Sequence, residues 1–155
     1  MGLEIEKKFL VVSDAWKQQA SRCVQYRQGY LCGNERTSIR IRISDASAHL
    51  NIKSATLGVR RQEYEYAIPA EDARELLDTL CIHPLIEKTR HFVPHGDHVW
   101  EVDVFEGDNA GLVVAEVELR HIDDSPSLPP WVGDEVSHDV RYYNTSLVRH
   151  PYKDW

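Results

Sequence analysis

Residues 3–9 read Leu-Glu-Ile-Glu-Lys-Lys-Phe and alternate charged with apolar side chains almost from the start of the chain. Successive side chains of a β-strand point to opposite faces, so a strand here places Glu4, Glu6 and Lys8 together on one face. For this stretch alone, the simplest interpretation is the solvent-exposed face of a sheet. Lys7 interrupts the apolar face and has no predicted role.

Six further segments alternate in the same way, and each predicts a strand. These segments are residues 38–44, 50–54, 61–67, 85–92, 99–105 and 112–119. Residues 24–31 predict one more strand, which we expect at a sheet edge with an interruption at Gly29. The chain is therefore expected to be rich in β-structure.

One clear amphipathic helix is predicted over residues 71–81, where Ala73, Leu76, Leu77 and Leu80 follow helical spacing. This stripe must be buried, and the apolar outer faces of the strands are its expected partner.

Two shorter helices are expected towards the ends of the chain. Ser13 or Asp14 is the expected cap of the first helix, and Asn144 that of the second, because a small polar side chain accepts from free N–H groups of the first turn. Residues 125–130 should be irregular, and residues 131–133 should form at most one turn.

Length and composition predict a single folded unit over residues 1–155. With 42% hydrophobic and 28% charged residues, the chain resembles soluble globular proteins and not disordered ones. No run of about 18 apolar residues predicts a membrane helix, and the acidic N-terminal stretch is unlike a signal peptide, so we expect a cytoplasmic protein without a membrane partner. A formal net charge of −7 argues against nucleic acid as a partner. Three cysteines without a CxxC spacing favour reduced thiols.

The charged strand faces carry eight acids and six bases. The acids are Glu4, Glu6, Glu63, Glu65, Glu101, Asp103, Glu116 and Glu118, and the bases are Lys8, Arg40, Arg42, Lys53, Lys88 and Arg90. A solvated face of an antiparallel sheet is the plain alternative. Three observations argue against this alternative. The faces are almost purely charged, acidic and basic pairs occur on different strands, and the amphipathic helix needs the opposite, apolar faces to pack against. Such a sheet can close into a barrel with the charge inside.

A charged lumen of this kind needs a charged ligand. Buried charges cost several kcal/mol each unless they are paired or solvated. Guanidinium and ammonium groups match phosphate oxygens, which suits a polyphosphate. The carboxylates beside them suit a hard divalent cation such as Mg²⁺ or Mn²⁺.

The opening residues Glu4-x-Glu6-x-Lys8 resemble the ExExK signature of the CYTH superfamily, also called triphosphate tunnel metalloenzymes. The resemblance covers essentially the whole chain, and the ensemble is far more specific than ExExK alone. The further matching positions, in the family's order, are Arg40-x-Arg42, Lys53, Glu63-x-Glu65, Lys88-x-Arg90, Glu101-x-Asp103, Glu116-x-Glu118 and Arg141. Residues 100–105, 111–116 and 141–144 are most similar to the short bacterial inorganic triphosphatase members. Residues 120–121 depart from the expected proline-containing segment, outside the expected lumen.

The resemblance implies a mainly β, α+β fold: a closed eight-stranded antiparallel β-barrel, or tunnel, with a charged lumen and helices packed outside. It also implies a role for each matching residue. Glu4, Glu6, Glu116 and Glu118 would hold the metal, with Glu4, Glu6, Lys8 and Glu118 as catalytic residues. The phosphate-binding residues would be Lys8, Arg40, Arg42, Lys53, Lys88, Arg90 and Arg141. Glu63, Glu65, Glu101 and Asp103 would orient these bases or hold a second metal, or only neutralise the lumen arginines.

The expected activity is metal-dependent hydrolysis of inorganic tripolyphosphate to pyrophosphate and phosphate, because a short chain leaves little room for a base or thiazole pocket. Two alternatives stay open at this point. One is a nucleotide-using member, either a class IV adenylyl cyclase or a nucleoside or thiamine triphosphatase. The other is a non-catalytic polyphosphate-binding module. The sequence does not fix the oligomeric state, although the tyrosines and tryptophans are compatible with a homodimer face.

Overall fold

Each segment predicted as a strand forms one, and a ninth strand follows near the C-terminal end. The computed structural model describes residues 2–155. Its strands are β1 (Leu3–Val11), β2 (Arg22–Gly33), β3 (Thr37–Ile43), β4 (Ala48–Ser54), β5 (Arg60–Ala67), β6 (Ile86–His95), β7 (His98–Phe105), β8 (Val113–Glu118) and β9 (Val132–Glu135). The helices are α1 (Ala70–Thr79) and α2 (Asn144–Arg149), with short 3₁₀ turns η1 (Ala15–Gln18), η2 (Gly107–Asn109), η3 (Val140–Tyr142) and η4 (Tyr152–Asp154).

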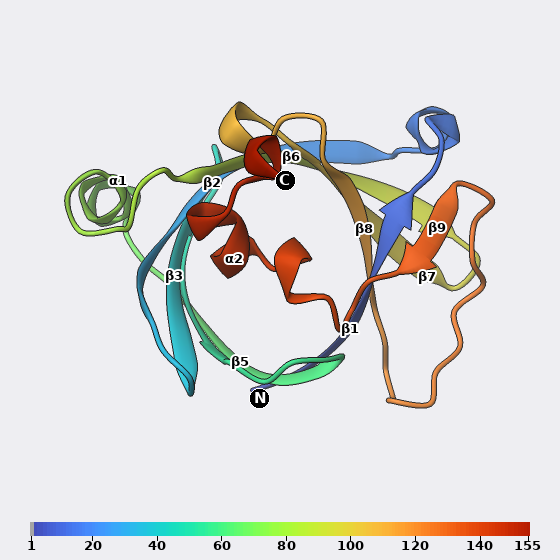
Figure 1. Cartoon of the computed structure of the whole chain (residues 1–155), viewed down its shortest axis with the longest axis horizontal. Helices are drawn as coiled ribbons and strands as arrows, with labels where there is room; N and C mark the ends of the chain where they lie inside the picture. Colours follow the sequence, from blue (N-terminus) through green and yellow to red (C-terminus); the bar gives the residue numbers. More distant parts are fainter. Residues whose placement is uncertain (1) are drawn as a thin grey trace.

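Eight of the strands close into a ring, as expected (Figure 1). Their order is β5-β4-β3-β2-β6-β7-β8-β1, every pair is antiparallel, and β1 pairs back onto β5. The first part of β1, at Leu3 to Ile5, pairs with β5, whereas Phe9 and Val11 pair with β9. The short β9 thus continues the seam along one edge of β1. The prediction of at most one turn over residues 131–133 is wrong.

Strand β2 lies inside the sheet between β3 and β6, so its expected edge position is wrong. A closed ring leaves no edge for it to occupy. Gly29 does not interrupt the pairing; the register shift falls between Tyr30 and Cys32 instead. A Cβ atom at Gly29 would lie 2.8 Å from the Cβ atom of Cys81, so this glycine permits close approach of the segment after α1.

Two apolar clusters cover the outside of the ring. Helix α1 packs Ala73 and Leu77 against Ile41 of β3, as its spacing predicts. The sequence predicts Leu80 as the last residue of the buried stripe, but Leu80 follows the end of the helix and is 64% exposed. The buried stripe therefore ends at Leu77. The second cluster lies over β1, β7 and β8 and contains Trp16, Trp100 and Trp131.

The third apolar cluster lies at one end of the lumen and involves the C-terminal segment. Ile86, Phe105 and Val114 share the inward face of their strands with the charged residues, two positions along from Lys88, Asp103 and Glu116. They pack against Tyr142, Leu147 and Val148. Figure 1 accordingly shows α1 outside the ring, whereas α2 lies within its outline. One end of the tunnel is therefore plugged by α2 and its neighbours.

The expected side-chain cap is present at the first short helix and absent at the second: Oγ of Ser13 accepts from the N–H of Ala15 at 3.4 Å, whereas Asn144 does not cap α2. The first is only the 3₁₀ turn η1, and the side chain of Asp14 at its N-cap makes no capping hydrogen bond. Helix α2 has Tyr143 at its N-cap, again without a side-chain bond. The Oδ1 atom of Asn144 instead accepts from Nε2 of Gln28 and from Nζ of Lys88. Asn144 therefore links α2 to the charged lumen.

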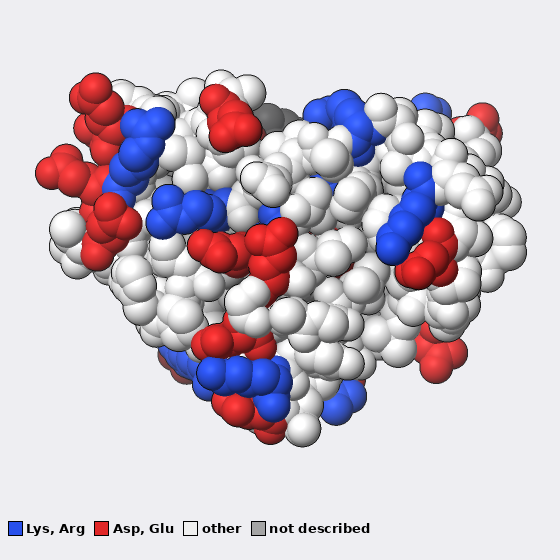
Figure 2. Space-filling model, turned by 90° about the horizontal axis from the view of Figure 1, so that it is seen from above, with Lys and Arg blue, Asp and Glu red and all other residues white. Residues whose placement is uncertain are grey.

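The outer surface has no broad basic region on the face that Figure 2 shows, where acidic and basic side chains are interspersed among uncharged ones. No helix in the described part of the chain, residues 2–155, is long and apolar enough to cross a bilayer.

Candidate active site

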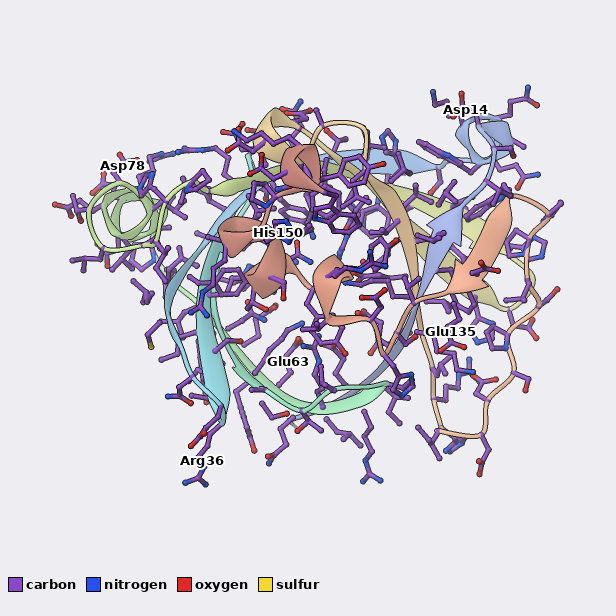
Figure 3. The ribbon with its side chains drawn as sticks, viewed as in Figure 1. Asp14, Arg36, Glu63, Asp78, Glu135 and His150 are labelled. Atoms are coloured by element: carbon purple, nitrogen blue, oxygen red, sulfur yellow. The ribbon has the colours of Figure 1, made fainter. Side chains whose placement is uncertain are left out.

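The lumen holds a cavity of about 200 Å³ that is lined mainly by charged side chains. Seven acidic and seven basic side chains line it. The acids are Glu4, Glu6, Glu63, Glu65, Glu101, Glu116 and Glu118, and the bases are Lys8, Arg40, Arg42, Lys53, Arg61, Lys88 and Arg90. Figure 3 shows Glu63 inside the ring, whereas Arg36 and Asp78 lie on its outside.

One buried carboxylate organises the cations of β6. Asp103 is fully buried and accepts from Nζ of Lys88 at 2.8 Å and from Nε of Arg90 at 2.8 Å. Burial raises the pKa of Asp103, but the charges of Arg90 and Lys88 outweigh it, and the net pKa is lowered. Arg90 also contacts Glu101 and lies 3.4 Å from Glu116. The guanidinium and ammonium groups are thereby fixed in place.

A second cluster joins β4, β5 and the start of β1. Nζ of Lys53 lies 3.1 Å from Oε2 of Glu4 and 3.0 Å from Oε2 of Glu63. Burial raises the pKa of Glu4, and a hydrogen bond with Glu63 raises it further. Burial alone would raise the pKa of Glu63, but the hydrogen bond with Glu4 and the charge of Lys53 lower it to about 2. The pKa values of these two carboxyl groups therefore shift in opposite directions beside Lys53.

Glu6 and Glu118 face each other across the β1–β8 pair, where their Cα atoms are in register. They are the two cavity carboxylates that form no ion pair within residues 2–155. Burial, followed by the negative charges of Glu116 and Glu4, raises the pKa of Glu6 well above its usual range. A charged Glu6 is therefore disfavoured here unless a further cation enters this end of the cavity.

The opposite imbalance occurs on β3. Arg40 is buried and forms no ion pair within the described residues, and its Nε atom has no hydrogen-bond partner there. Burial, and then the positive charges of Arg40 and Arg90, lower the pKa of Arg42. Unpaired donors and mutually repelling cations in a buried wall indicate a site for an anion.

The C-terminal segment positions Lys8 from the plugged end. Its Nζ atom donates to the carbonyl oxygen of Tyr142 at 3.0 Å and lies 3.5 Å from Oε1 of Glu116. It also lies 5.5 Å from the ring centroid of Tyr143. The hydroxyl of Tyr143 donates to the carbonyl of Ser137 and accepts from the N–H of Gly58, which ties this segment to the β4–β5 connection.

The sequence model of the CYTH domain matches residues 2–152 of this chain. The chain belongs to the CYTH family. An inorganic triphosphatase from Acetivibrio thermocellus is 45% identical over 155 residues, which is 100% of this chain and 99% of the relative. An inorganic triphosphatase from Nitrosomonas europaea is 36% identical over 150 residues, covering 94% of this chain and 96% of the relative. The crystal structure of the inorganic triphosphatase NE1496 has a TM-score of 0.67 and 33% identity, covering 94% of this chain and 97% of its own.

Within this CYTH chain, the cavity brings together every predicted site residue except two. Asp103 lies behind the wall and supports Lys88 and Arg90 from there. Arg141 is absent from the cavity walls; its side chain is 57% exposed, bonds to Asp139 and stacks over the ring of Trp155. Phosphate binding by Arg141 therefore stays a prediction that this arrangement does not support.

Arg61 lines the cavity although the sequence analysis did not select it. It lies two residues before Glu63 on β5, so the same period-two alternation places it on the inward face. Extending the alternation by one step would have found it. Tyr143, at the N-cap of α2, could not be found in this way because it lies on no strand.

The carboxylate oxygens of Glu4, Glu6, Glu116 and Glu118 are the donor chemistry that Mg²⁺ and Mn²⁺ prefer. Glu6 and Glu118 also lack an ion-pair partner within the described residues, which leaves them free to bind a cation. Within residues 2–155, however, no three such groups are gathered closely enough to ligate one ion. Glu4 is held by Lys53 and Arg61, and Glu116 by Lys8 and Arg90. The residues fit a divalent cation provided that these carboxylates exchange partners.

Proposed function

We propose that this chain hydrolyses inorganic tripolyphosphate to pyrophosphate and phosphate, with Mg²⁺ or Mn²⁺, inside the charged ring. The observation that carries the proposal is the compact cavity walled by seven cations and seven carboxylates. Two relatives that align with nearly the whole chain bear the name inorganic triphosphatase, which supports the same activity.

The size and polarity of the cavity favour an inorganic substrate over a nucleotide. Pockets for drug-sized organic ligands usually enclose about 300–1,000 Å³ and are lined mainly by apolar and aromatic groups. This cavity encloses about 200 Å³, is lined mainly by charges, and ends at the apolar plug. Because the part of the chain that the structure describes lines this cavity mainly with charges and offers few apolar side chains for a base or thiazole ring, adenylyl cyclase and nucleoside or thiamine triphosphatase activities are less well supported.

Six of the seven cavity cations are the proposed phosphate ligands: Lys8, Arg40, Arg42, Lys53, Lys88 and Arg90. Phosphoryl transfer requires positioning and stabilisation of charge on the phosphoryl oxygens, with little other chemistry from the protein. Asp103 holds Lys88 and Arg90 rigidly, so these two cations need little reorganisation when the anion binds. Arg40 offers unpaired donors, which makes it the proposed main ligand of the polyphosphate.

The carboxylates Glu4, Glu6 and Glu118, with Glu116, are the proposed holders of the divalent cation. When bound, the cation supplies positive charge beside the reacting phosphoryl group. Glu4, Glu6, Glu118 and Lys8 are the proposed catalytic residues, since they surround this end of the cavity. Glu63, Glu65 and Glu101 hold the neighbouring bases, which supports an orienting role.

Charge balance also supports the cation. Cations and carboxylates are equal in number in the cavity walls, so a bare polyanion would leave the interior strongly negative. Buried net charge is costly unless it is compensated. Entry of a divalent cation with the polyphosphate reduces this cost.

A side-by-side assay tests the proposal. Phosphate release from tripolyphosphate, ATP and thiamine triphosphate is measured with Mg²⁺, with Mn²⁺ and with EDTA. We expect tripolyphosphate to be the preferred substrate and EDTA to abolish its cleavage. Intact tripolyphosphate together with formation of cyclic AMP from ATP would support the cyclase instead, and binding of tripolyphosphate without any cleavage would support the non-catalytic module.

A single structural unit over residues 1–155, a cytoplasmic location, and tyrosines and tryptophans compatible with a homodimer face complete the proposal. They remain predictions from the sequence.

A further inference from the structure

Arg61 differs from the other cavity cations in the carboxylates that surround it. Its Cα atom is in register with that of Glu4 across the β1–β5 seam, and its Nη2 atom lies 3.5 Å from Oε1 of Glu4. Burial lowers the pKa of Arg61, but the charges of Glu4, Glu6 and Glu116 outweigh burial and raise it. Arg61 therefore neutralises the same carboxylates that we propose to hold the divalent cation.

Within residues 2–155, Glu4 is the only ion-pair partner of Arg61, whereas Lys53 also contacts Glu63. If a divalent cation takes over Glu4, Lys53 keeps Glu63, but Arg61 loses its counter-ion. The Arg61 side chain is only 22% exposed, so water compensates its charge poorly. A guanidinium left in this position needs another anion.

The ring of Tyr143 keeps Arg61 facing the cavity. The guanidinium carbon of Arg61 lies 5.6 Å from the Tyr143 ring centroid, within the range of a cation–π contact. The hydroxyl of Tyr143 is fixed by Ser137 and Gly58. A released Arg61 is thereby held beside the space where a phosphate chain would lie.

We propose that Arg61 is an exchangeable counter-ion. It neutralises Glu4 in the free protein, and it transfers to a phosphoryl oxygen of the substrate when a divalent cation takes over Glu4. The inference rests on the proposed function. It adds a residue that couples cation binding by Glu4 to binding of the polyphosphate. The guanidinium fork suits both partners, because it pairs with carboxylate and phosphate oxygens alike.

The test uses Arg61→Met, which removes the positive charge and keeps a side chain of similar length. It measures the contact of Arg61 with Glu4 and its contact with the substrate separately. Mn²⁺ binding without substrate is measured by the loss of the free-ion EPR signal. We expect Arg61→Met to bind Mn²⁺ about fivefold more tightly or better, because a cation that competes for Glu4 is gone. Calorimetry in EDTA should show that Arg61→Met binds tripolyphosphate with an affinity within about twofold of wild type. Without a divalent cation, Arg61 of the wild-type protein stays paired with Glu4 and does not contact the substrate. With saturating Mg²⁺, the KM for tripolyphosphate should rise about 10-fold.

Arg40→Met is the matched control, since Arg40 has no ion-pair partner within the described residues. It should weaken tripolyphosphate binding in EDTA about 10-fold and leave Mn²⁺ affinity unchanged. Arg61→Lys keeps the charge and should keep the wild-type Mn²⁺ affinity. If Arg61→Met does not fold, Arg61→Gln also removes the charge and should show the same tighter Mn²⁺ binding.

Two outcomes would overturn the role of Arg61. Mn²⁺ binding to Arg61→Met that is unchanged or weaker would make the Arg61–Glu4 contact a structural ion pair. Weaker tripolyphosphate binding in EDTA would make Arg61 a permanent phosphate ligand. Failure of the wild-type protein to cleave tripolyphosphate would instead refute the proposed function, whatever the Mn²⁺ result.

Discussion

At the scale of the residue, the ring keeps charges that ordinary protein interiors exclude. Lys88 is the most buried of the cavity cations, and burial lowers its pKa to about 8 even though Asp103 opposes the shift. The folded protein therefore releases a proton from this lysine more readily than the unfolded chain does. Such a group holds its charge at a cost, which a bound anion would offset.

This cost has a measurable signature in Lys88→Met. Between pH 8 and about 10.4 the unfolded chain keeps the Lys88 proton and the folded protein loses it, so the free energy of unfolding of the wild type rises with pH through this window. The variant lacks this term. Urea denaturation of both proteins at pH 8, 9 and 10 should show a difference that grows in favour of the wild type, by at most about 1.4 kcal/mol per pH unit. A difference that does not change with pH would contradict the buried-cation interpretation.

Most individual site residues could be predicted because period two is a property of the strand itself. Once Glu4, Glu6 and Lys8 share a face, the fold has only to decide whether that face is inside or outside. Arg141 shows the limit of the approach. It lies in the 3₁₀ turn η3, where no strand alternation fixes its direction, and it points away from the cavity towards Asp139.

At the scale of the element, the C-terminal segment does two tasks. Leu147 and Val148 plug one end of the lumen against Ile86 and Phe105. The backbone of the same segment accepts a hydrogen bond from Lys8. Packing of the plug and placement of a proposed catalytic lysine therefore depend on each other.

The plug should contribute strongly to stability. Leu147 is fully buried, so Leu147→Ala should lower the free energy of unfolding by about 2–5 kcal/mol, through lost burial and the cavity left behind. Val140→Ala is the matched control in the same segment; Val140 is exposed, and the change should stay within about 0.5 kcal/mol. Urea denaturation measures both. Equal effects of the two changes would mean that α2 does not seal the ring.

Elements with a strong local pattern were predicted well, and elements defined by their partners were not. Helix α1 and the alternating strands carry their periodicity in the sequence. Strand β9 has four residues and exists because β1 offers it a free stretch of edge beyond β5. The placement of α2 inside the ring likewise depends on the apolar end of the lumen, which no single segment encodes.

At the scale of the whole molecule, closure of the sheet is what turns ordinary charged strand faces into a site. The pairing of β1 with β5 removes the faces from bulk water and gathers equal numbers of cations and carboxylates around one small cavity. Within residues 2–155, Arg40 on β3 has no ion-pair partner, and neither Glu6 on β1 nor Glu118 on β8 has one. A polyphosphate together with a divalent cation satisfies both walls at once.

The ³¹P NMR spectrum of tripolyphosphate incubated with the protein and Mg²⁺ tests this most directly. We predict that the tripolyphosphate signals are replaced by those of pyrophosphate and phosphate in equal amounts. Glu6→Gln, which removes a proposed metal-holding carboxyl group without an ion-pair partner in the described residues, should stop this conversion without unfolding the protein, as followed by circular dichroism. Unchanged tripolyphosphate with the wild-type protein, or full conversion by Glu6→Gln, would contradict a triphosphatase that works through these carboxylates.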